Sequence, residues 1–283
     1  ILKEKPDRFL VLGDTNSSLG AFVAKRLGVP VFHMEAGNRQ YDYIVPEEIN
    51  RRIIDNCSDI LLPYTNRSCE NLIKEGFNRH SIFVTGNPIF EVMNKFTKKI
   101  NDSKILKKLK IKKKNYFLLT LHRQENVDNK ERLKFIMRTL DSINKKFKLP
   151  IIWPAHPRTI KNLKLFKLKV SEKVKVINPS DFFNFIKLET NAFCVLTDSG
   201  TVQEECSILK IPNIILRDKT ERPETIESGS SIISMNNSSD IINAINFTTK
   251  NEILPNYVSG YHEINVSNKI LNIILSNYEF DNI

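Results

Sequence analysis

The sequence predicts an α/β protein with two domains, and two observations lead to this prediction. Short apolar runs alternate with amphipathic stretches along most of the 283 residues, which is the pattern of parallel strands joined by helices. A Lys-rich stretch of low apolar content, residues 95–115, interrupts this alternation. We therefore predict an N-terminal domain at 1–94, a linker at 95–115 with one short helix, and a second domain at 116–260.

The N-terminal domain is predicted to begin with a βαβ unit. Residues 8–13, RFLVLG, form an expected buried strand, and residues 29–34 form the next one. Between them, residues 16–27 are expected to be a helix that ends at Gly28, because glycine suits the position after a helix C-terminus. Its apolar residues recur at helical spacing, at Leu19, Phe22, Val23 and Leu27.

The next helix of this domain is expected to begin at Pro46. Proline suits the first helical position, and the carboxylates of Glu47 and Glu48 complement the helix dipole. The remaining elements predicted here are a strand at 59–62, a helix at 65–75, a strand at 82–85 and a helix that opens after Pro88.

The second domain shows the same alternation. Its predicted strands lie at 116–121, 150–153, 174–177, 192–196 and 213–216, and its helices at 130–146, 158–167, 180–188, after residue 199 and after residue 238. A final apolar helix is expected at 266–276. Ligands of open parallel sheets bind at the carboxyl ends of the strands, so we expect a cleft between the two domains to hold the active site.

The formal net charge of +11 bears on the kind of partner. Lysines cluster at 107–114 and 161–175, and charge runs of this kind favour solvated faces. Nucleic-acid binding is the alternative, but no RNP, zinc-finger or helix-turn-helix signature supports it, so we expect no nucleic-acid partner. A polyanionic small molecule such as a nucleotide diphosphate would also suit a basic cleft.

Membrane, export and metal signals are missing from the sequence. It holds no apolar run long enough to span a membrane and no secretory signal. The four cysteines show neither CxxC pairing nor zinc spacing, and the five histidines form no HExxH pattern. We therefore expect a cytoplasmic protein with reduced thiols, no metal and no membrane partner.

A local acidic cluster at residues 33–52 stands out from this basic background. Glu35 follows the second predicted strand and Asp14 follows the first, so both carboxylates are expected at one edge of the sheet. Like-charged pairs of this kind raise one pKa, which suits a general acid or base; Glu35 could instead pair with Arg39. The spacing of Glu47 and Glu48 favours helix-start electrostatics and i,i+4 pairs with Arg51 and Arg52.

In the second domain, polar residues again follow the predicted strands. His122 follows the strand at 116–121 and His156 follows the strand at 150–153. The turn Asp198-Ser199-Gly200-Thr201 opens a helix, where backbone N–H groups and two hydroxyls favour a phosphate. An ordinary capped helix is the alternative, because the turn is neither GxxxxGK[ST] nor GxGxxG. Further on, Glu205 could reach a ribose hydroxyl, and Arg217 and Arg222 could neutralise a diphosphate.

Taken together, these motifs resemble the non-hydrolysing UDP-N-acetylglucosamine 2-epimerase family. The matching pieces occur in family order from Gly13 to Glu224. They are GDTNSSL, HMEAGNR, PEEINRR, SDILLPYT, VTGNPI, LHRQENVD, AHPRT, LTDSGTVQEE and RDKTERPE. The combination of HxEAG with PEExNR, DSG and TERPE is specific.

The resemblance implies two Rossmann-like domains of the GT-B type with the nucleotide sugar bound between them. It implies interconversion of UDP-N-acetylglucosamine (UDP-GlcNAc) and UDP-N-acetylmannosamine (UDP-ManNAc), which supplies surface polysaccharide synthesis. Removal of the C2 proton and anti elimination of UDP would give 2-acetamidoglucal, to which UDP adds back. No nicotinamide cofactor or metal is implied. A homodimer is implied, as is a C-terminal helix within 261–283 that packs on the first domain.

The resemblance also assigns residues. The implied catalytic positions are Asp14, Glu35, Glu47 and His122, which leaves Glu48 with a structural role. The implied substrate-binding positions are Arg51, Arg123, His156, Phe185 (against the uracil), Ser199, Gly200, Glu205 and Arg222. Thr201 stands where the family usually has a second glycine, which would alter how the backbone approaches the diphosphate.

Three alternatives to this function stay open. The family begins with a strand and a GTRPE-like loop that this sequence lacks, so we expect an incomplete first domain and, as one alternative, an inactive nucleotide-sugar-binding remnant. Another is a GT-B glycosyltransferase, which gives no reason for three carboxylates in the cleft. The third is a 2-epimerase of another UDP-acetamido sugar, a 6-deoxy sugar or a diacetamido-uronate.

Overall fold

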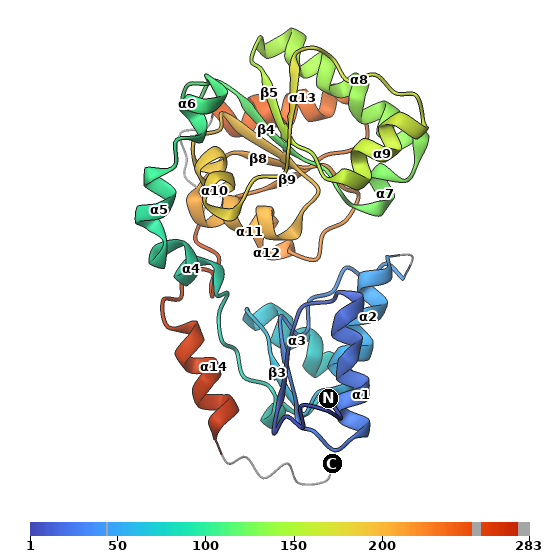
Figure 1. Cartoon of the computed structure of the whole chain (residues 1–283), viewed down its shortest axis with the longest axis vertical. Helices are drawn as coiled ribbons and strands as arrows, with labels where there is room; N and C mark the ends of the chain where they lie inside the picture. The colour runs from blue at the N-terminus through green and yellow to red at the C-terminus, as the bar shows by residue number, and fades with distance from the viewer. Residues whose placement is uncertain (44, 251–255, 277–283) are drawn as a thin grey trace. The chain divides into compact units, whose positions relative to one another are not determined.

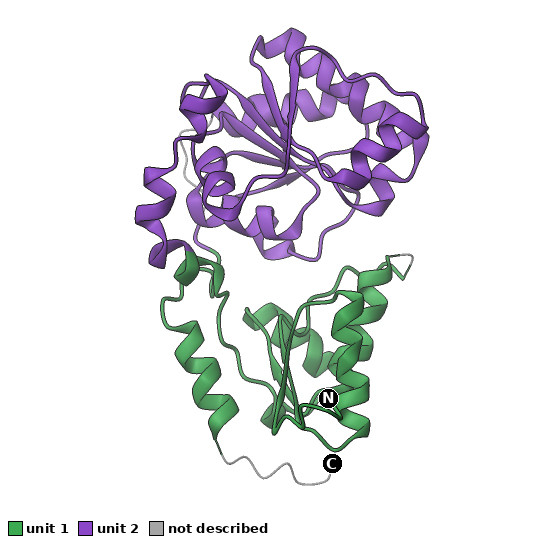
Figure 2. Ribbon diagram, viewed as in Figure 1, with its two compact units in different colours: residues 1–92, 258–283 green, residues 93–257 purple. Residues whose placement is uncertain are grey.

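The chain forms two compact units, which are described one at a time. In the computed structural model, which describes residues 1–43, 45–250 and 256–276, unit 1 comprises Ile1–Val92 and Val258–Ile283, and unit 2 comprises Met93–Tyr257 (Figure 2). The C-terminal segment thus belongs to unit 1.

The segment 95–115 differs from the predicted linker with one short helix. It lies in unit 2 and forms two helices, α5 (Thr97–Asp102) and α6 (Ile105–Leu109). The physical reason is that its few apolar residues are used for packing: Ile105 and Leu109 are buried in one of the cores of unit 2. The lysines between them remain exposed, as long charged side chains do on a surface helix.

Unit 1 contains a parallel three-stranded sheet in the order β1-β2-β3. Its strands are β1 (Phe9–Leu12), β2 (Val31–Met34) and β3 (Ile60–Leu62). Its helices are α1 (Gly20–Arg26), which follows the 3-10 turn η1 (Asn16–Leu19), α2 (Pro46–Cys57), α3 (Asn66–Lys74), α4 (Ile89–Lys95, ending in unit 2) and α14 (Val266–Leu275) (Figure 1). A further 3-10 turn is η2 (Arg79–Ser81).

Each face of this sheet has its own helices, because successive strand side chains point to opposite sides. On one face, Val11 and Val31 pack with Ala21 and Ala24 of α1 and Ile54 of α2. On the other face, Val266 and Ile270 of α14 pack with the strand residues Phe32, Ile60 and Leu62. Helix α14 therefore covers one face of the sheet formed by β1, β2 and β3.

The edge strand β1 is more exposed than the buried strand that was predicted. Leu10 is 46% exposed and Leu12 is 55% exposed, because they lie on the α14 side, where the core contains residues of β2 and β3.

The buried face of α1 also differs from the prediction: Ala21 and Ala24 are buried, whereas Phe22 is 54% exposed. The 3-10 turn before α1 has fewer residues per turn and so rotates the face that the helix buries. Residues 82–85 form one bridge, from Ile82 to Leu61, rather than the predicted strand.

Unit 2 contains a parallel six-stranded sheet in the order β6-β5-β4-β7-β8-β9. The strands are β4 (Phe117–Thr120), β5 (Ile151–Pro154), β6 (Val174–Ile177), β7 (Cys194–Thr197), β8 (Asn213–Ile215) and β9 (Ile232–Ile233). Counted from β4, this is the 3-2-1-4-5-6 order of the Rossmann fold, with the reversal of order between β4 and β7.

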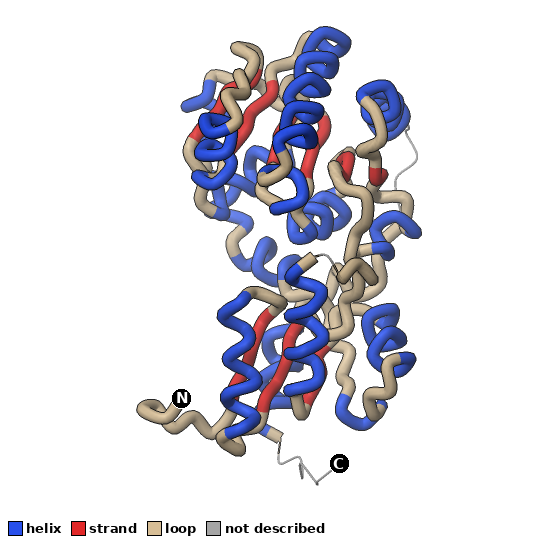
Figure 3. Tube along the Cα trace, turned by 90° about the vertical axis from the view of Figure 1, so that its right-hand side faces the viewer, coloured by secondary structure: helices blue, strands red, loops and turns tan. Residues whose placement is uncertain are grey.

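Helices cover both faces of this sheet (Figure 3). Besides α5 and α6, they are α7 (Gln124–Val127), α8 (Lys130–Phe147), α9 (Pro157–Leu165), α10 (Phe182–Thr190), α11 (Gly200–Leu209), α12 (Pro223–Glu227) and α13 (Ser238–Lys250). Strands buried on both faces are continuous apolar runs, as in β4 and β7, whose residues are all buried. Across the described residues, no helix has the length and apolar character needed to cross a bilayer.

Candidate active site

Two residues with carboxylate side chains lie at the carboxyl edge of the sheet in unit 1. Asp14 follows β1 and Glu35 follows β2, after strands that pair in parallel. A methyl group built on Gly13 would lie 3.7 Å from Oε2 of Glu35, so the carboxyl group of Glu35 lies against the residue that precedes Asp14. Glu35 has a positive φ of 69°, a conformation that is uncommon for residues other than glycine and that clusters at functional sites.

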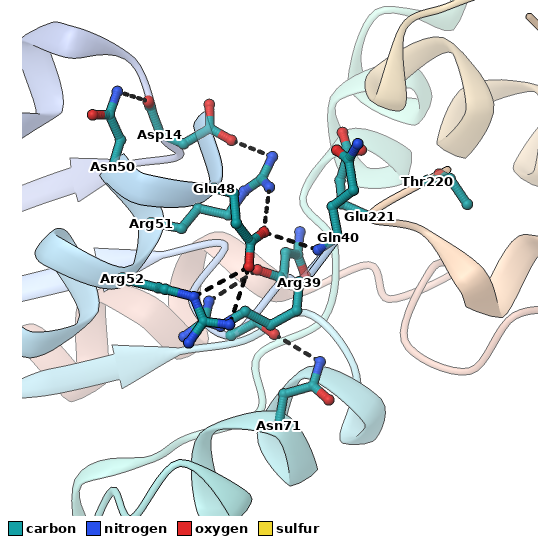
Figure 4. A network of polar contacts seen from close by, with 12 residues as sticks. Asp14, Arg39, Gln40, Glu48, Asn50, Arg51, Arg52, Asn71, Thr220 and Glu221 are labelled. Atoms are coloured by element: carbon teal, nitrogen blue, oxygen red, sulfur yellow. Dashed lines mark hydrogen bonds and ion pairs between the residues drawn. The ribbon is translucent and has the colours of Figure 1, made fainter. Parts of the chain in front are cut away.

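Arg51 of α2 connects Asp14 to Glu48 (Figure 4). Its Nη2 lies 2.6 Å from Oδ2 of Asp14, and its Nη1 donates to Oε2 of Glu48 at 3.4 Å. The side chain of Arg51 is 2% exposed. Asn50 also holds the loop after β1, since its Nδ2 donates to the carbonyl oxygen of Asp14 at 2.8 Å.

Glu47 and Glu48 differ in their surroundings. Glu48 is completely buried; its Oε2 accepts from the backbone N–H of Gln40 at 2.9 Å, and its Oε1 pairs with Arg52 at 3.2 Å (Figure 4). Glu47 is half-buried. The burial and contacts of Glu48 fit the structural role predicted for it.

A second buried network lies behind this edge, and the sequence reasoning missed its centre, Asp55. His33 lies 2.7 Å from Oδ1 of Asp55 through Nδ1 and 3.2 Å from the carbonyl oxygen of Gly13 through Nε2. Arg39 pairs with Asp55 at 2.6 Å and with Glu75 at 2.6 Å. Burial opposes the charge of Asp55, but the hydrogen bond from His33 and the charges of His33 and Arg39 outweigh it, so its pKa is lowered. The sequence signal for Asp55 was its position on α2, the helix that also carries Arg51, four residues after that arginine.

In unit 2, residues after three strands line one pocket of about 180 Å³. His122 follows β4, His156 follows β5 and Ser199 follows β7, and Phe185 of α10 lies beside them. This pocket lies at the carboxyl ends of β4 and β7, where the strand order reverses and where Rossmann folds bind ligands. The structure therefore brings together four of the residues predicted for substrate binding or catalysis.

Asp198, which is completely buried, holds the loop that carries His122. Its carboxylate accepts from the backbone N–H groups of His122 and Arg123 at 3.1 and 3.0 Å and from Nδ2 of Asn126 at 3.1 Å. Oδ1 of Asp198 also lies 3.4 Å from Nδ1 of His122. Sequence reasoning treated Asp198 only as part of a phosphate turn, because its partners lie 72 to 76 residues away.

The imidazole of His122 is 44% exposed, yet its pKa is lowered. Desolvation by the surrounding protein is the largest cause, and the neighbouring charge of Asp198 opposes it. Positive charges lower it further, at Arg123, His156 and Arg217. A neutral imidazole at neutral pH can both accept and donate a proton.

The start of α11 carries the turn that was predicted to bind phosphate. Ser199 is the residue before the helix, and its own N–H donates to Oγ1 of Thr197 at 3.0 Å. A methyl group on Gly200 would lie 2.6 Å from Oε1 of Glu221, so Gly200 is required for close packing. Glu221 in turn pairs with Arg217 at 2.6 Å and with Arg123 at 2.9 Å. Sequence reasoning missed Glu221, although the motif RDKTERPE contains it.

The other predicted binding residues of unit 2 do not line this pocket: Arg123, Gly200, Thr201, Glu205 and Arg222. Thr201 is exposed on the first turn of α11. Glu205 is 4% exposed and Arg222 is 3% exposed. Arg222 forms an ion pair with Glu204, so its charge is already balanced inside unit 2.

The comparisons with known proteins agree with one another. The family model described as UDP-N-acetylglucosamine 2-epimerase matches residues 1–275. A protein of Methanocaldococcus jannaschii named UDP-N-acetylglucosamine 2-epimerase is 47% identical over 265 residues, which cover 87% of this chain and 69% of that protein. A Pseudomonas aeruginosa protein named UDP-2,3-diacetamido-2,3-dideoxy-D-glucuronate 2-epimerase is 39% identical over 236 residues, covering 82% of this chain and 65% of that protein.

Among solved structures, the fold is similar to that of the Methanocaldococcus jannaschii UDP-GlcNAc 2-epimerase in complex with UDP-GlcNAc and UDP. The TM-score is 0.91 at 42% identity, over 96% of this chain and 76% of that one. A family model that matches nearly the whole sequence, together with relatives of this identity, leads to one conclusion: the chain belongs to the UDP-N-acetylglucosamine 2-epimerase family.

Proposed function

We propose that this protein interconverts UDP-GlcNAc and UDP-ManNAc as a non-hydrolysing 2-epimerase. The observation that carries the proposal is the pair of carboxylates at the ends of β1 and β2, Asp14 and Glu35, with Arg51 beside them. Two carboxyl groups in unlike environments suit a reaction in which one group removes a proton and another returns it. The family membership of the chain supports this assignment.

Unit 1 supplies the groups that move the C2 proton in this mechanism. One carboxylate takes the proton, the C1–O bond to UDP breaks, and 2-acetamidoglucal forms. A proton then returns to C2 from the opposite face as UDP adds back at C1, so the atoms balance without an oxidant. Glu35 and Asp14 are the foremost candidates; Glu47 of unit 1 and His122 of unit 2 are the further residues proposed to take part. The reaction as written requires no nicotinamide cofactor and no metal.

Unit 2 binds the UDP moiety in this proposal. The helix α11 begins at Gly200, directly after Ser199 of the pocket, and the N-terminal end of a helix favours a diphosphate. Phe185 offers a ring against the uracil, and His156 and Ser199 offer polar contacts. Arg123, Arg222, Gly200, Thr201 and Glu205 are the further binding residues proposed.

The decisive experiment is incubation with UDP-GlcNAc in D2O, followed by mass spectrometry and NMR. Deuterium at C2 and the appearance of UDP-ManNAc are expected. UDP binding without any exchange would overturn the proposal and favour the nucleotide-sugar-binding remnant. Transfer of the sugar to an acceptor would favour a glycosyltransferase.

Glu35→Gln is the sharpest variant, because it keeps the size of the side chain and removes its charge. We expect C2 exchange to be lost while UDP binding persists. Glu70→Gln, at an exposed position on α3, is the matched control and should exchange as the wild type does. Retained exchange in Glu35→Gln would remove this residue from the chemistry.

A diacetamido-uronate is the second candidate substrate, and the Pseudomonas aeruginosa relative favours it. The same exchange assay with UDP-2,3-diacetamido-2,3-dideoxy-glucuronate separates the two, since the preferred substrate has the higher kcat/KM.

We further propose a homodimer, as the resemblance implies. Light scattering after size-exclusion chromatography would test it, and a monomeric mass would contradict it.

A further inference from the structure

One buried pair of side chains in unit 1, His33 of β2 and Asp55 of α2, has no part in the mechanism above. Both residues are completely buried, and Nδ1 of His33 lies 2.7 Å from Oδ1 of Asp55. Burying charged groups is costly unless other groups bind them, so the remaining contacts of the pair indicate what it does. These contacts lead to the two loops that carry Asp14 and Glu35.

Asp55 holds the loop after β2 directly. Its Oδ2 accepts from the backbone N–H of Gly37 at 3.3 Å and from Nη2 of Arg39 at 2.6 Å. Gly37 lies two residues after Glu35, whose φ is positive. A residue other than glycine keeps this conformation only where the surrounding structure fixes it, and the bonds to Asp55 fix the chain that follows Glu35.

His33 holds the loop after β1. Its Nε2 lies 3.2 Å from the carbonyl oxygen of Gly13. This oxygen belongs to the planar peptide unit that joins Gly13 to Asp14, so the contact sets the direction in which the chain enters Asp14. The N–H of Gly13 donates to the carbonyl oxygen of Met34 at 3.1 Å. The peptide groups on both sides of Gly13 are therefore bound to β2.

Both ring nitrogens of His33 face acceptors, which determines where its hydrogens lie. The carbonyl oxygen of Gly13 can only accept, and the pKa of Asp55 is lowered, so its carboxylate is ionised at neutral pH and only accepts as well. Each ring nitrogen must then carry a hydrogen, which makes the ring an imidazolium. Its charge and that of Arg39 lie against the carboxylates of Asp55 and Glu75.

We propose that His33, protonated on both ring nitrogens, and Asp55 are positioning residues for the epimerase reaction. The pair binds the loops after β1 and β2, and thereby holds Asp14 and Glu35 in the arrangement that the proton transfers require. Both members are completely buried, so they act through the loops and not on the substrate. This inference rests on the proposed function, because it takes Asp14 and Glu35 as groups that move the proton.

Two substitutions of His33 separate its two contacts. Glutamine can place its amide nitrogen near the position of Nε2 and asparagine near that of Nδ1, so His33→Gln keeps a donor for Gly13 and His33→Asn does not. In the D2O assay, we expect kcat to fall about 100-fold in His33→Asn and to stay at least about tenfold higher in His33→Gln. The dissociation constant for UDP should not change, since its proposed pocket lies in unit 2. His80→Asn, at an exposed position, is the control and should exchange as the wild type does.

Nitrogen-15 NMR of the ring nitrogens gives a signature that a packing role would not produce. At neutral pH, the wild type should carry hydrogens on both nitrogens of His33. In Asp55→Asn, the single amide oxygen should serve Gly37 and Arg39, which can only donate, and the amide NH2 group then faces Nδ1. His33 should therefore become neutral in this variant, with its hydrogen on Nε2.

A neutral His33 ring in the wild type would overturn the inference while the proposed function stands. The same holds if His33→Asn exchanges as fast as the wild type, or if His33→Asn and His33→Gln lose exchange equally. A wild type that shows no C2 exchange would instead overturn the proposed function, and the positioning role with it. If His33→Asn does not fold, the wild-type spectrum decides, with the ring of His33 assigned through its backbone resonances.

Discussion

At the scale of single residues, the neighbouring carboxylates Glu47 and Glu48 differ in burial, and we expect them to differ in role. Glu48 is completely buried and pairs with Arg51 and Arg52, whereas Glu47 is half-buried. A buried charge stripped of its partner is costly, whereas a half-buried carboxylate keeps part of its surface accessible to a ligand. The two positions should therefore respond to substitution in different ways.

Glu48→Leu should lower the free energy of unfolding by roughly 3–5 kcal/mol, since the variant leaves the buried guanidinium of Arg51 with fewer partners. Glu47→Gln should change that free energy by less than about 0.5 kcal/mol but abolish C2 exchange. Urea unfolding and the D2O assay measure the two effects. A stable Glu48→Leu, or full exchange in Glu47→Gln, would contradict the division of roles.

Ser199→Ala should weaken UDP binding roughly tenfold or more, because a hydroxyl bonded to a charged phosphate contributes about 1.5–3 kcal/mol. Thr201→Ala is the matched control: its side chain is exposed on the next residue, and we expect a smaller loss. Calorimetric titration with UDP compares them. Equal dissociation constants for wild type and Ser199→Ala would remove Ser199 from the phosphate site.

The carboxyl group of Glu189 also makes stability depend on pH. Its pKa is raised by burial from the ordinary 4.5 to about 8, so folding binds a proton between these values. This contribution is present in full below about 4.5 and is lost as the pH rises through about 8. The free energy of unfolding of Glu189→Gln should therefore fall less over this window than that of the wild type. If urea unfolding shows the same change of the free energy of unfolding with pH in the two proteins, the prediction is wrong.

At the scale of elements, five strands of unit 2 were predicted from their apolar runs, whereas the two-residue strand β9 (Ile232–Ile233) was not predicted. The apolar run at 116–121 corresponds to β4 and the run at 192–196 to β7, and the polar residues that follow them line one pocket. The structure of segment 95–115 was not predictable, because its packing depends on two buried apolar side chains, Ile105 and Leu109, in a stretch that is otherwise rich in lysine. The face of α1 and the partners of Asp198 depend on tertiary contacts, which periodicity does not contain.

Helix α14 gives a prediction with an internal control. Ile270 is 5% exposed and packs on Phe32 and Leu62, whereas the neighbouring Leu271 is 52% exposed. Ile270→Ala should lower the stability of unit 1 by roughly 2–5 kcal/mol, and Leu271→Ala should change it by less than about 0.5 kcal/mol. Trp153, the one tryptophan, lies buried in unit 2. We therefore expect Ile270→Ala to shift the circular-dichroism transition but not that of tryptophan fluorescence; an equal shift of both would show that the units unfold together.

At the scale of the whole molecule, unit 2 is continuous in sequence and unit 1 is not. A fragment of residues 93–257 contains both apolar clusters of its sheet and should fold alone with a protected Trp153 and bind UDP. A fragment of residues 1–92 exposes Phe32, Ile60 and Leu62 and should aggregate unless a peptide of residues 256–276 is added. Size-exclusion chromatography and fluorescence test both; a soluble, folded 1–92 fragment would contradict the role given to α14.

The return of the chain to unit 1 has a consequence for synthesis on the ribosome. Contacts between residues far apart in sequence form only when both have emerged. The sheet face that Phe32 and Leu62 present is made before unit 2, yet its cover, Val266–Leu275, is translated after unit 2. One face of the three-stranded sheet of unit 1 therefore stays uncovered while all of unit 2 is synthesised and folds. A nascent chain of this kind is a natural client for chaperones that shield apolar surface, and for proteases when translation stops early.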